Sequence, residues 1–486
     1  MDAVATAVNL IRKGLHAAGM RGAEKYPTPP LEKGKFDYVA EAGGEDFVVG
    51  FAKETVTPPD INKKTYWVAG YGMYKPASAV LDEIMAHAVW IDDRSGHGGI
   101  ALVSVDAIGI MKADVDRIRA SMKGFCEQTG CRAIHIFATH DHASLDTMGI
   151  WGMVPLTGRR TAHLNLLLKN VQKAVYGAYN NRKPGALYHG TVKVPDMQED
   201  IRLPVVYSDV LTRLRFVPND GSAETYIINF ASHSESLSSS NSMVSADFPG
   251  YFRREILKRT GAECCYCLGA IGGMISMKTS GRTLPEKIQQ TMDLGVKLAG
   301  YCLSINNERR LKPKISIITQ EFYFSAENST LMLMGLFNVL PTKREYSKDA
   351  PLGYIIKSEL TYMELDDIKM AFIPGELFPE LAYGGYLDAE HSATRKGAEA
   401  NPLPLCEMAG DPDMLIFGLA NDEVGYIVPP NDFILSETQP YLDRAKDHMG
   451  RNHYEETNSL GPNTAPKIAE VFAGVLETVK QAKRGH

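Results

Sequence analysis

One short segment constrains the fold of this chain more than any other. Ile134, Ile136 and Phe137 are apolar and β-favouring, which is typical of a buried strand. The strand runs directly into a polar turn in which His140 and His142 lie two positions apart. Side chains at positions i and i+2 of an extended segment point to the same side. The segment therefore predicts a metal site or a proton-transfer site at the end of a strand.

The same arrangement recurs further along the chain. The apolar run 226–231 leads to His233, the run 368–373 leads through Pro-Gly to Glu376, and the run 413–419 is followed closely by Tyr426. These strands alternate with amphipathic helical segments, and active sites in such folds gather at strand ends. We therefore expect an α/β fold, with mixed β-sheets flanked by helices and the active site at strand ends.

The expected elements follow from hydrophobic periodicity. Helices are predicted over residues 4–15, 112–128, 160–179, 251–257 and 284–305 and from about 465 onward. Further strands are predicted at 47–52, 85–92, 99–106, 191–196, 213–217, 263–268, 315–324, 331–333 and 360–365. Residues 1–45, with their Pro-rich connector at 26–30, are expected to form an N-terminal extension, and residues 46–486 a catalytic domain.

Composition excludes several classes of protein. Hydrophobic residues make up 44% of the 486 positions, so a large core is expected. The net charge of −6 comes without a basic stripe, which argues against a nucleic-acid partner. No apolar run approaches the roughly 18 residues of a membrane span. The first 20 residues lack a signal-peptide layout, so the expected location is the cytoplasm.

The seven cysteines show no disulfide framework, and reduced thiols are expected. A zinc knuckle formed by Cys264, Cys265 and Cys267 is an alternative, although their flanking residues are typical of a core strand.

The strand ends bring together the donors that a catalytic zinc requires, about three N and O ligands and one open position. Two histidines and a glutamate fit this demand, and a neighbouring tyrosine can ligate or stabilise an oxyanion. Each residue also has a structural interpretation: a hydrogen-bonded turn histidine, a helix-start carboxylate or an edge aromatic. A serine hydrolase that uses Ser144 or Ser276 is a weaker alternative, because neither lies in a G-x-S-x-G turn.

The chain resembles the neutral/alkaline (non-lysosomal) ceramidase family between about Val48 and Pro462. The resemblance is carried by an ordered series of short blocks rather than by one motif. These blocks lie at 49–58, 69–72, 138–144 (Ala-Thr-His-Asp-His-Ala-Ser), 229–233, 245–251, 374–376 (Pro-Gly-Glu), 421–430 and 454–462.

The resemblance implies one zinc ion per chain, bound by His140, His233, Glu376 and Tyr426. It further implies that His142 and Tyr454 stabilise the tetrahedral intermediate when metal-bound water attacks an amide carbonyl. Only the catalytic domain is matched, without the C-terminal β-sandwich domain of the family.

The substrate expected from the sequence is a small or N-acyl amide rather than ceramide, because the loop 272–276 lacks the acidic residue of the family. An ester or lactone hydrolase on the same scaffold, and a non-catalytic metal- or ligand-binding homologue, remain alternatives. A homo-oligomer is among the assembly states left open.

Overall fold

The protein is described by a computed structural model that covers residues 3–153 and 155–485. In this part of the chain the helices are α1 (Ala3–Lys25), α2 (Lys112–Ser121), α3 (Lys123–Thr129), α4 (Thr161–Asn180), α5 (Asp247–Thr260), α6 (Leu284–Leu303), α7 (Ser329–Leu336), α8 (Pro379–Tyr383), α9 (Leu405–Met408) and α10 (Thr464–Arg484), with the 3-10 turns η1 (Ala398–Ala400), η2 (Pro430–Asp432) and η3 (Glu455–Asn458). None of these helices combines the length and hydropathy needed to cross a bilayer.

A large mixed sheet forms the centre of the molecule. Among the described residues it has nine strands in the order β11-β9-β8-β6-β1-β3-β4-β5, with β13 beside β6. Most neighbours are antiparallel, but β4 with β5 and β9 with β11 run parallel. Its strands are β1 (Phe47–Thr55), β3 (Met85–Asp92), β4 (Ile100–Val105), β5 (Ala133–Ala138), β6 (Lys183–Lys193), β8 (Val210–Pro218), β9 (Thr225–Phe230), β11 (Glu263–Leu268) and β13 (Arg309–Arg310).

A second sheet, five-stranded within the described residues, has the order β14-β16-β17-β19 with β15 beside β16. Its strands are β14 (Ile315–Ser325), β15 (Arg344–Tyr346), β16 (Tyr354–Leu365), β17 (Ile368–Phe372) and β19 (Leu415–Phe417). The remaining strands pair in twos: β2 (Ala79–Val80) with β10 (Met243–Val244), β7 (Gln198–Asp200) with β12 (Ile275–Met277), β18 (Glu376–Leu377) with β20 (Tyr426–Ile427), and β21 (Ala445–Lys446) with β22 (Asn452–His453).

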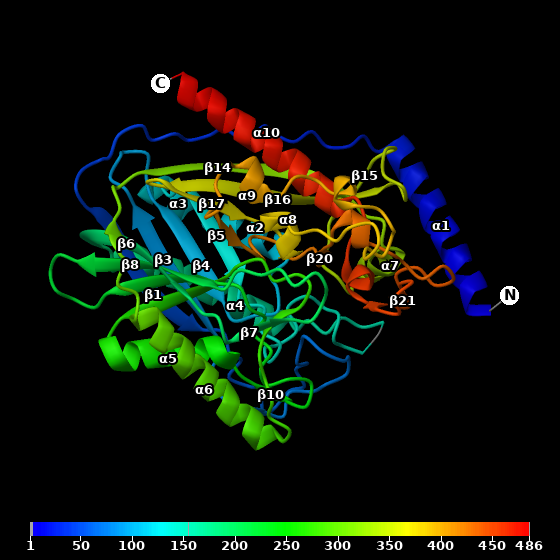
Figure 1. The fold of residues 1–486 in the computed structure, drawn as a ribbon, viewed down its shortest axis with the longest axis horizontal. Helices are drawn as coiled ribbons and strands as arrows, with labels where there is room; N and C mark the ends of the chain where they lie inside the picture. The colour runs from blue at the N-terminus through cyan, green and yellow to red at the C-terminus, as the bar shows by residue number, and fades with distance from the viewer. Residues whose placement is uncertain (1–2, 154, 486) are drawn as a thin grey trace.

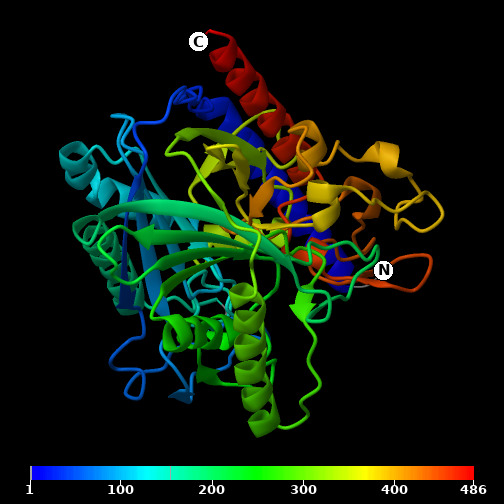
Figure 2. The ribbon, with the colours of Figure 1, turned by 60° about the vertical axis from the view of Figure 1, so that its left-hand side comes forward.

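The two larger sheets face each other across an apolar core. Phe137 of β5 packs against Phe372 and Phe417 of the second sheet, with ring centroids 5.1 and 5.5 Å away. A further cluster joins the large sheet to α2, α4, α5 and α6, and another joins the second sheet to α8 and α10. The layers therefore run helix, sheet, sheet, helix, with α10 on one side and α5 and α6 on the other (Figure 1, Figure 2).

The chain that follows β19 fastens the second sheet to the edge of the first. The backbone N–H of Asn421 donates to the Ile136 carbonyl at 2.7 Å, and the Asn421 side-chain oxygen accepts from the Ile136 N–H at 2.8 Å. The Ala138 N–H in turn donates to the Leu419 carbonyl at 3.2 Å. These bonds hold the end of β5 next to the end of β19.

The expected fold class is confirmed: the protein is α/β, with mixed sheets flanked by helices. One predicted strand is wrong, and another is observed only in part. Residues 331–333 belong to α7, because the Asn328 side chain accepts from the N–H groups of Thr330 and Leu331 and so starts a helix. The strand expected at 191–196 is the end of β6, whose first half carries Pro184 and Gly185, residues that are rare inside strands. The helix expected over 112–128 is interrupted at Met122.

The zinc knuckle is also ruled out by the geometry of β11. Cys264 packs in the core against the helices, whereas Cys265 and Cys267 face the core between the sheets. Alternation along a strand sends neighbouring side chains to opposite faces, so the three thiols do not converge. Each of the seven cysteines, all within the described residues, is a free thiol.

The core between the sheets predicts a large stability difference between two matched substitutions. Phe372 is 0% exposed, whereas Phe337 at the end of α7 is 67% exposed. We expect Phe372→Ala to lower the free energy of unfolding by about 3–5 kcal/mol, because it leaves a cavity between the sheets. Phe337→Ala is expected to change it by about 0.5 kcal/mol or less. Denaturant unfolding of both variants measures this, and equal losses would show that the sheets do not pack through Phe372.

Candidate metal centre and active site

His140 lies directly beyond β5, in a turn that holds its backbone at φ +49°. A non-glycine residue with positive φ is strained, and such residues are common at functional sites. Its ring Nδ1–H donates to the Ile108 carbonyl at 2.7 Å. Its Nε2 faces Oε2 of Glu376 at 3.4 Å.

His233 occupies the equivalent place beyond β9. Its Nδ1–H donates to the Ile275 carbonyl at 2.9 Å, and its Nε2 lies 3.1 Å from the same Oε2 of Glu376. The side chain is completely buried. Two imidazoles from different strands thus meet at one carboxylate oxygen.

Glu376 and Tyr426 are brought together by backbone pairing. β18 and β20 run parallel, and Glu376 is the direct partner of Tyr426 in that register. Burial favours the neutral form of Glu376, but His140 and His233 outweigh it and hold the pKa of the carboxyl below its usual range. Burial alone would lower the pKa of His233. The carboxylates of Glu376 and Glu235 outweigh burial, so the pKa of His233 lies above its ordinary value.

His142 lies beside both of these histidines. Its ring centroid is 4.7 Å from that of His140 and 5.7 Å from that of His233. Neither ring nitrogen has a hydrogen-bond partner among the described residues. Burial, followed by the effect of His140, lowers the pKa of His142 to about 3. His140, His142 and His233 each have a ring nitrogen that lies within 4.8 Å of a ring nitrogen of the other two. Three nitrogens at this spacing can hold a metal ion.

The two tyrosines predicted from the sequence are in contact. The hydroxyl oxygens of Tyr426 and Tyr454 lie 3.3 Å apart, and the Tyr426 hydroxyl also donates to Sδ of Met274 at 3.2 Å. Burial raises the pKa of both phenols, and the negative charge of Glu376 raises that of Tyr426 further. Both phenols therefore keep their protons and can donate hydrogen bonds.

Tyr454 is positioned by a buried arginine. The Arg202 guanidinium contacts Glu455 at 2.8 Å and Glu456 at 3.0 Å, the two residues that follow the tyrosine. Arg202 also lies over the ring of Phe378, 4.9 Å from its centroid. It thereby links the segment that carries Tyr454 to the segment that carries Glu376.

Glu235 is a site residue that sequence reasoning missed. Its carboxylate lies 3.6 Å from Nδ1 of His142, and it accepts hydrogen bonds from the hydroxyls of Tyr71 (2.8 Å) and Ser276. The signal was present, because Glu235 stands two positions after His233 in an extended turn and so shares its side. Ser276 donates to Glu235 and Ser144 to the Asp141 carbonyl, so neither is paired with a histidine as a serine nucleophile requires.

These residues open into a cavity of about 1220 Å³. His140, His142, Glu376, Tyr426 and Tyr454 all contribute to its lining. The remaining lining is rich in apolar and aromatic side chains, among them Met73, Met111, Met148, Trp151, Met274, Tyr323, Leu331, Met332, Met334, Leu340 and Ile356. Charged side chains also contribute, among them Lys112, Asp116, Glu321, Lys343, Arg344, Glu345 and Lys357. A ligand that reaches the histidines therefore passes along a largely apolar surface.

The donor set fits a divalent metal ion. A carbonyl oxygen only accepts, so Nδ1 of His140 and of His233 must each carry the proton, as is usual for metal-binding histidines. In the neutral rings both Nε2 lone pairs then face the carboxylate of Glu376. A proton on Nε2 turns the ring into an imidazolium that pairs with the carboxylate, as the raised pKa of His233 favours. A divalent ion in the same place would take the two lone pairs and the carboxylate as ligands, and imidazole and carboxylate are ligands that zinc accepts.

No family model and no curated protein sequence matches the chain. Solved structures do match its fold. The neutral ceramidase from Pseudomonas aeruginosa superposes with a TM-score of 0.66 and 14% identity, covering 88% of this chain and 74% of that one. A ceramidase complexed with C2 gives a TM-score of 0.65 and 13% identity, covering 91% and 76% of the two chains. The protein therefore has the neutral ceramidase fold, in a sequence that has diverged far from both of these enzymes.

Proposed function

We propose that the protein is a zinc-dependent hydrolase that cleaves the carbon–nitrogen bond of a linear amide. One observation carries the proposal: two buried imidazoles, each fixed by a backbone carbonyl, direct Nε2 at the same carboxylate oxygen of Glu376. The shared fold with ceramidases, which by name are amide hydrolases, supports the same reaction class.

His140, His233, Glu376 and Tyr426 would hold the metal. A divalent ion bound there supplies Lewis acidity and lowers the pKa of a coordinated water toward about 7. The remaining groups of the site then serve to orient the substrate and to move protons.

His142 is the proton carrier in this proposal. With Nδ1–H directed at Glu235, its Nε2 is free to take a proton from the attacking water. The resulting imidazolium stabilises negative charge on the carbonyl oxygen and then returns the proton to the leaving nitrogen. The first proton of the water thus ends on the amine product. The acid product keeps the water oxygen and the second water proton, which it releases to solvent as it ionises to the carboxylate.

Tyr454 acts on the carbonyl oxygen. Its raised pKa keeps the phenol protonated, so its O–H can donate to the oxygen as charge develops there. The adjacent phenol of Tyr426 and the contact of Arg202 with Glu455 hold Tyr454 in place.

The cavity supports an N-acyl amide as substrate. Its volume of about 1220 Å³ exceeds the roughly 300–1,000 Å³ of most small-ligand sites. A small amide alone would leave most of this space to water against apolar walls, whereas an attached acyl chain would bury them. An ester of the same shape could react at the same groups, and comparing matched amides and esters separates the two activities.

Removal of the metal is expected to abolish hydrolysis. The purified protein should contain about one zinc per chain by elemental analysis, and dialysis against a chelator should remove both metal and activity, with zinc restoring them. His233→Ala should lose the metal outright, because it deletes one of the two histidines that face Glu376. Full activity without metal would refute the proposal, and a zinc-loaded protein inert toward an acyl-amide series would favour a non-catalytic homologue.

Metal content also decides between two ligand sets. If His142 is a proton carrier, His142→Ala keeps about one zinc per chain but loses hydrolysis, and Tyr426→Phe weakens zinc binding. If the cluster of three histidines is the ligand set, His142→Ala loses zinc and Tyr426→Phe retains it. Elemental analysis of the two variants, with wild type alongside, distinguishes these results.

Glu235→Gln is expected to lower kcat by about 10- to 100-fold, a part of the roughly 10²- to 10⁴-fold that a positioned proton carrier contributes. The amide keeps the shape of the side chain but loses the charge that favours Nδ1–H of His142. KM and zinc content should stay near wild type, because Glu235 is not among the proposed ligands. Glu45→Gln, on the exposed surface, is the matched control. An unchanged kcat would remove Glu235 from the mechanism.

A further inference from the structure

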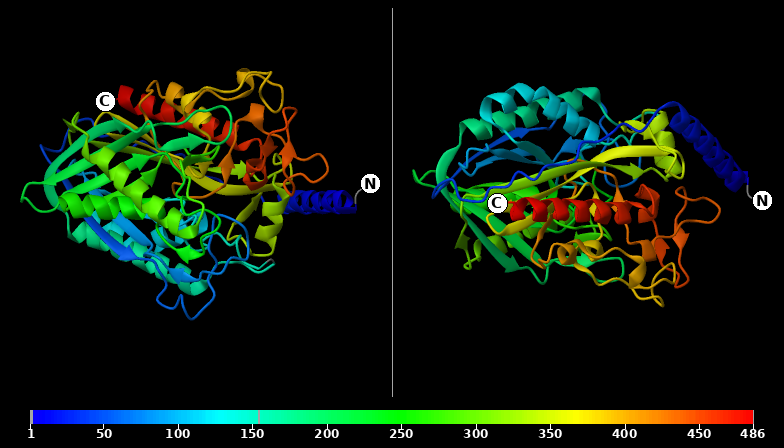
Figure 3. Two further views of the ribbon diagram at one scale, coloured as in Figure 1. Left: turned by 60° about the horizontal axis from the view of Figure 1, so that its bottom comes forward. Right: turned by 90° about the horizontal axis from the view of Figure 1, so that it is seen from above.

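The N-terminal extension forms part of the cavity wall. Pro29, Pro30, Leu31 and Glu32 line the same cavity as the candidate metal centre. They belong to the segment 26–35, which we call the strap. The strap begins at the end of α1 and runs back along the molecule. Helix α1 itself projects from one side of the molecule (Figure 1, Figure 3). The resemblance to ceramidases begins only near Val48, so it assigns the strap no role.

The strap is tied down on both sides of Leu31. The Thr28 hydroxyl donates to the Tyr346 carbonyl at 2.7 Å, before the lining residues. On the other side of Leu31, the Gln320 side chain donates to the Glu32 carbonyl at 3.2 Å and accepts from the Gly34 N–H at 2.8 Å. Hydrogen bonds to β14 and β15 therefore fix the strap at the edge of the second sheet.

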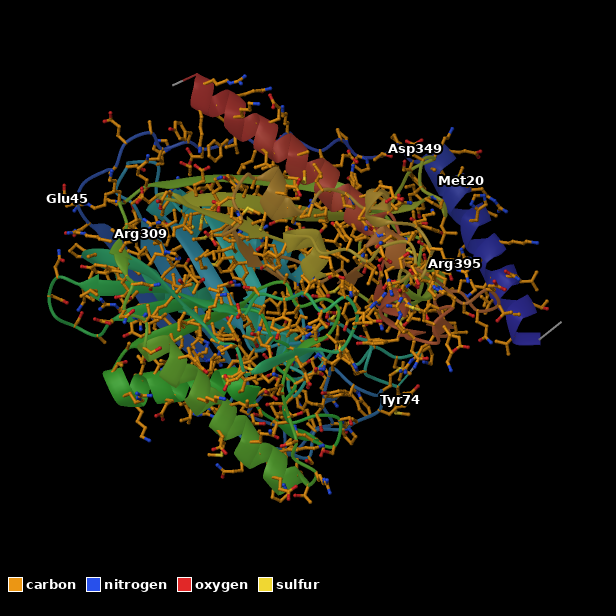
Figure 4. The ribbon with its side chains drawn as sticks, viewed as in Figure 1. Met20, Glu45, Tyr74, Arg309, Asp349 and Arg395 are labelled. Atoms are coloured by element: carbon orange, nitrogen blue, oxygen red, sulfur yellow. The ribbon has the colours of Figure 1, made fainter. Side chains whose placement is uncertain are left out.

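Helix α1 anchors the strap to the loop before β16. A Cβ on Gly19 would lie 1.9 Å from the Leu352 carbonyl oxygen, so only glycine allows this close approach. Figure 4 labels Met20 of α1 and Asp349 of that loop in the same corner of the view, and a Cβ on Gly353 of the loop would lie 2.6 Å from the Met20 nitrogen. At Gly14, by contrast, a Cβ would meet nothing within 4 Å. The closest backbone approach of the helix therefore lies in its C-terminal half, while Ala5 and Val8 are buried in its N-terminal half.

The same helix also supports α7, which contributes another part of the lining. Leu15 of α1 is buried in a cluster with Met332, Leu352 and Tyr354. Met332, together with Leu331 and Met334, lines the cavity. The extension therefore lines the cavity directly through residues 29–32, and its helix α1 packs behind the part of the lining that α7 provides.

We propose that the N-terminal extension forms a specificity subsite, which binds the acyl chain of the substrate and limits the chain length that the cavity accepts. The inference rests on the proposed amide hydrolysis. Proline, leucine and methionine side chains offer apolar contact without directional hydrogen bonds, which suits a flexible unbranched chain. Because the strap is hydrogen-bonded to the sheet edge, its position sets the space available to that chain.

The test compares Leu31→Trp and Leu31→Ala on N-acyl amides of increasing acyl length. The tryptophan should lower kcat/KM for the longest substrates by about tenfold, as expected when about two methylenes lose their contact, through KM rather than kcat. The acetyl amide should be unaffected. The alanine should shift the preference toward longer chains. Identical length profiles in wild type and both variants, with unchanged thermal unfolding, would overturn the inference.

A second measurement keeps this inference separate from the proposed function. Binding of a fluorescent fatty-acyl amide is titrated at several chain lengths, which requires no turnover. If no substrate is hydrolysed but Leu31→Trp still weakens binding of long probes only, the subsite stands and the hydrolase proposal fails. If hydrolysis is found and neither kcat/KM nor probe affinity depends on Leu31, the subsite fails.

Docking of the extension is tested by a matched glycine pair. Gly19→Ala should loosen α1, increase amide hydrogen exchange in residues 26–35 and broaden the length preference. Gly14→Ala should do neither, since its methyl group points into open space. Equal rates of amide hydrogen exchange in the strap of the two variants would show that α1 does not hold the strap in place.

Discussion

The structure depends on one buried meeting point, where two imidazoles face a single carboxylate oxygen. His233 is fully shielded from solvent, and His140 and Glu376 are each only 6% exposed at the side chain. Burial of such groups is costly unless their charges are balanced and their hydrogen bonds are made. The carbonyls of Ile108 and Ile275 satisfy one nitrogen of each ring, so only the side that faces Glu376 is left for a cation. The chemistry of the site follows from that arrangement.

The fold enforces the meeting point through backbone pairing rather than through flexible loops. Asn421 hydrogen-bonds to Ile136 of β5, which brings the end of the second sheet to the strand that precedes His140. The parallel pair β18–β20 then sets Glu376 directly beside Tyr426. Residues far apart in sequence are therefore fixed by hydrogen bonds within a few positions of each side chain, which is the precision that a metal site requires.

Strands and site residues could be predicted from the sequence where a local pattern of residues indicates them. Strands with apolar runs, such as 85–92 and 263–268, were predicted at their observed bounds, and polar residues beyond strands pointed to the four ends that meet. Features that depend on contacts between distant segments could not be predicted in this way. Asn328 turns an apolar run into α7, and the histidine that Glu235 contacts, His142, comes from a different strand end. Likewise, nothing local in residues 29–32 indicates that they line a cavity, since its other walls come from distant segments.

The position of Tyr454 shows how a segment with little regular structure can still hold a side chain in one place. Between η2 and η3 the chain forms only the short pair β21–β22, yet Tyr454 meets Tyr426 at 3.3 Å. Arg202 accounts for this, because it binds Asp432, Glu455 and Glu456 together. Ion pairs buried this deeply add little net stability once desolvation is counted. Their directional hydrogen bonds instead select one arrangement of the segment, and the arginine over Phe378 joins that arrangement to the strand bearing Glu376.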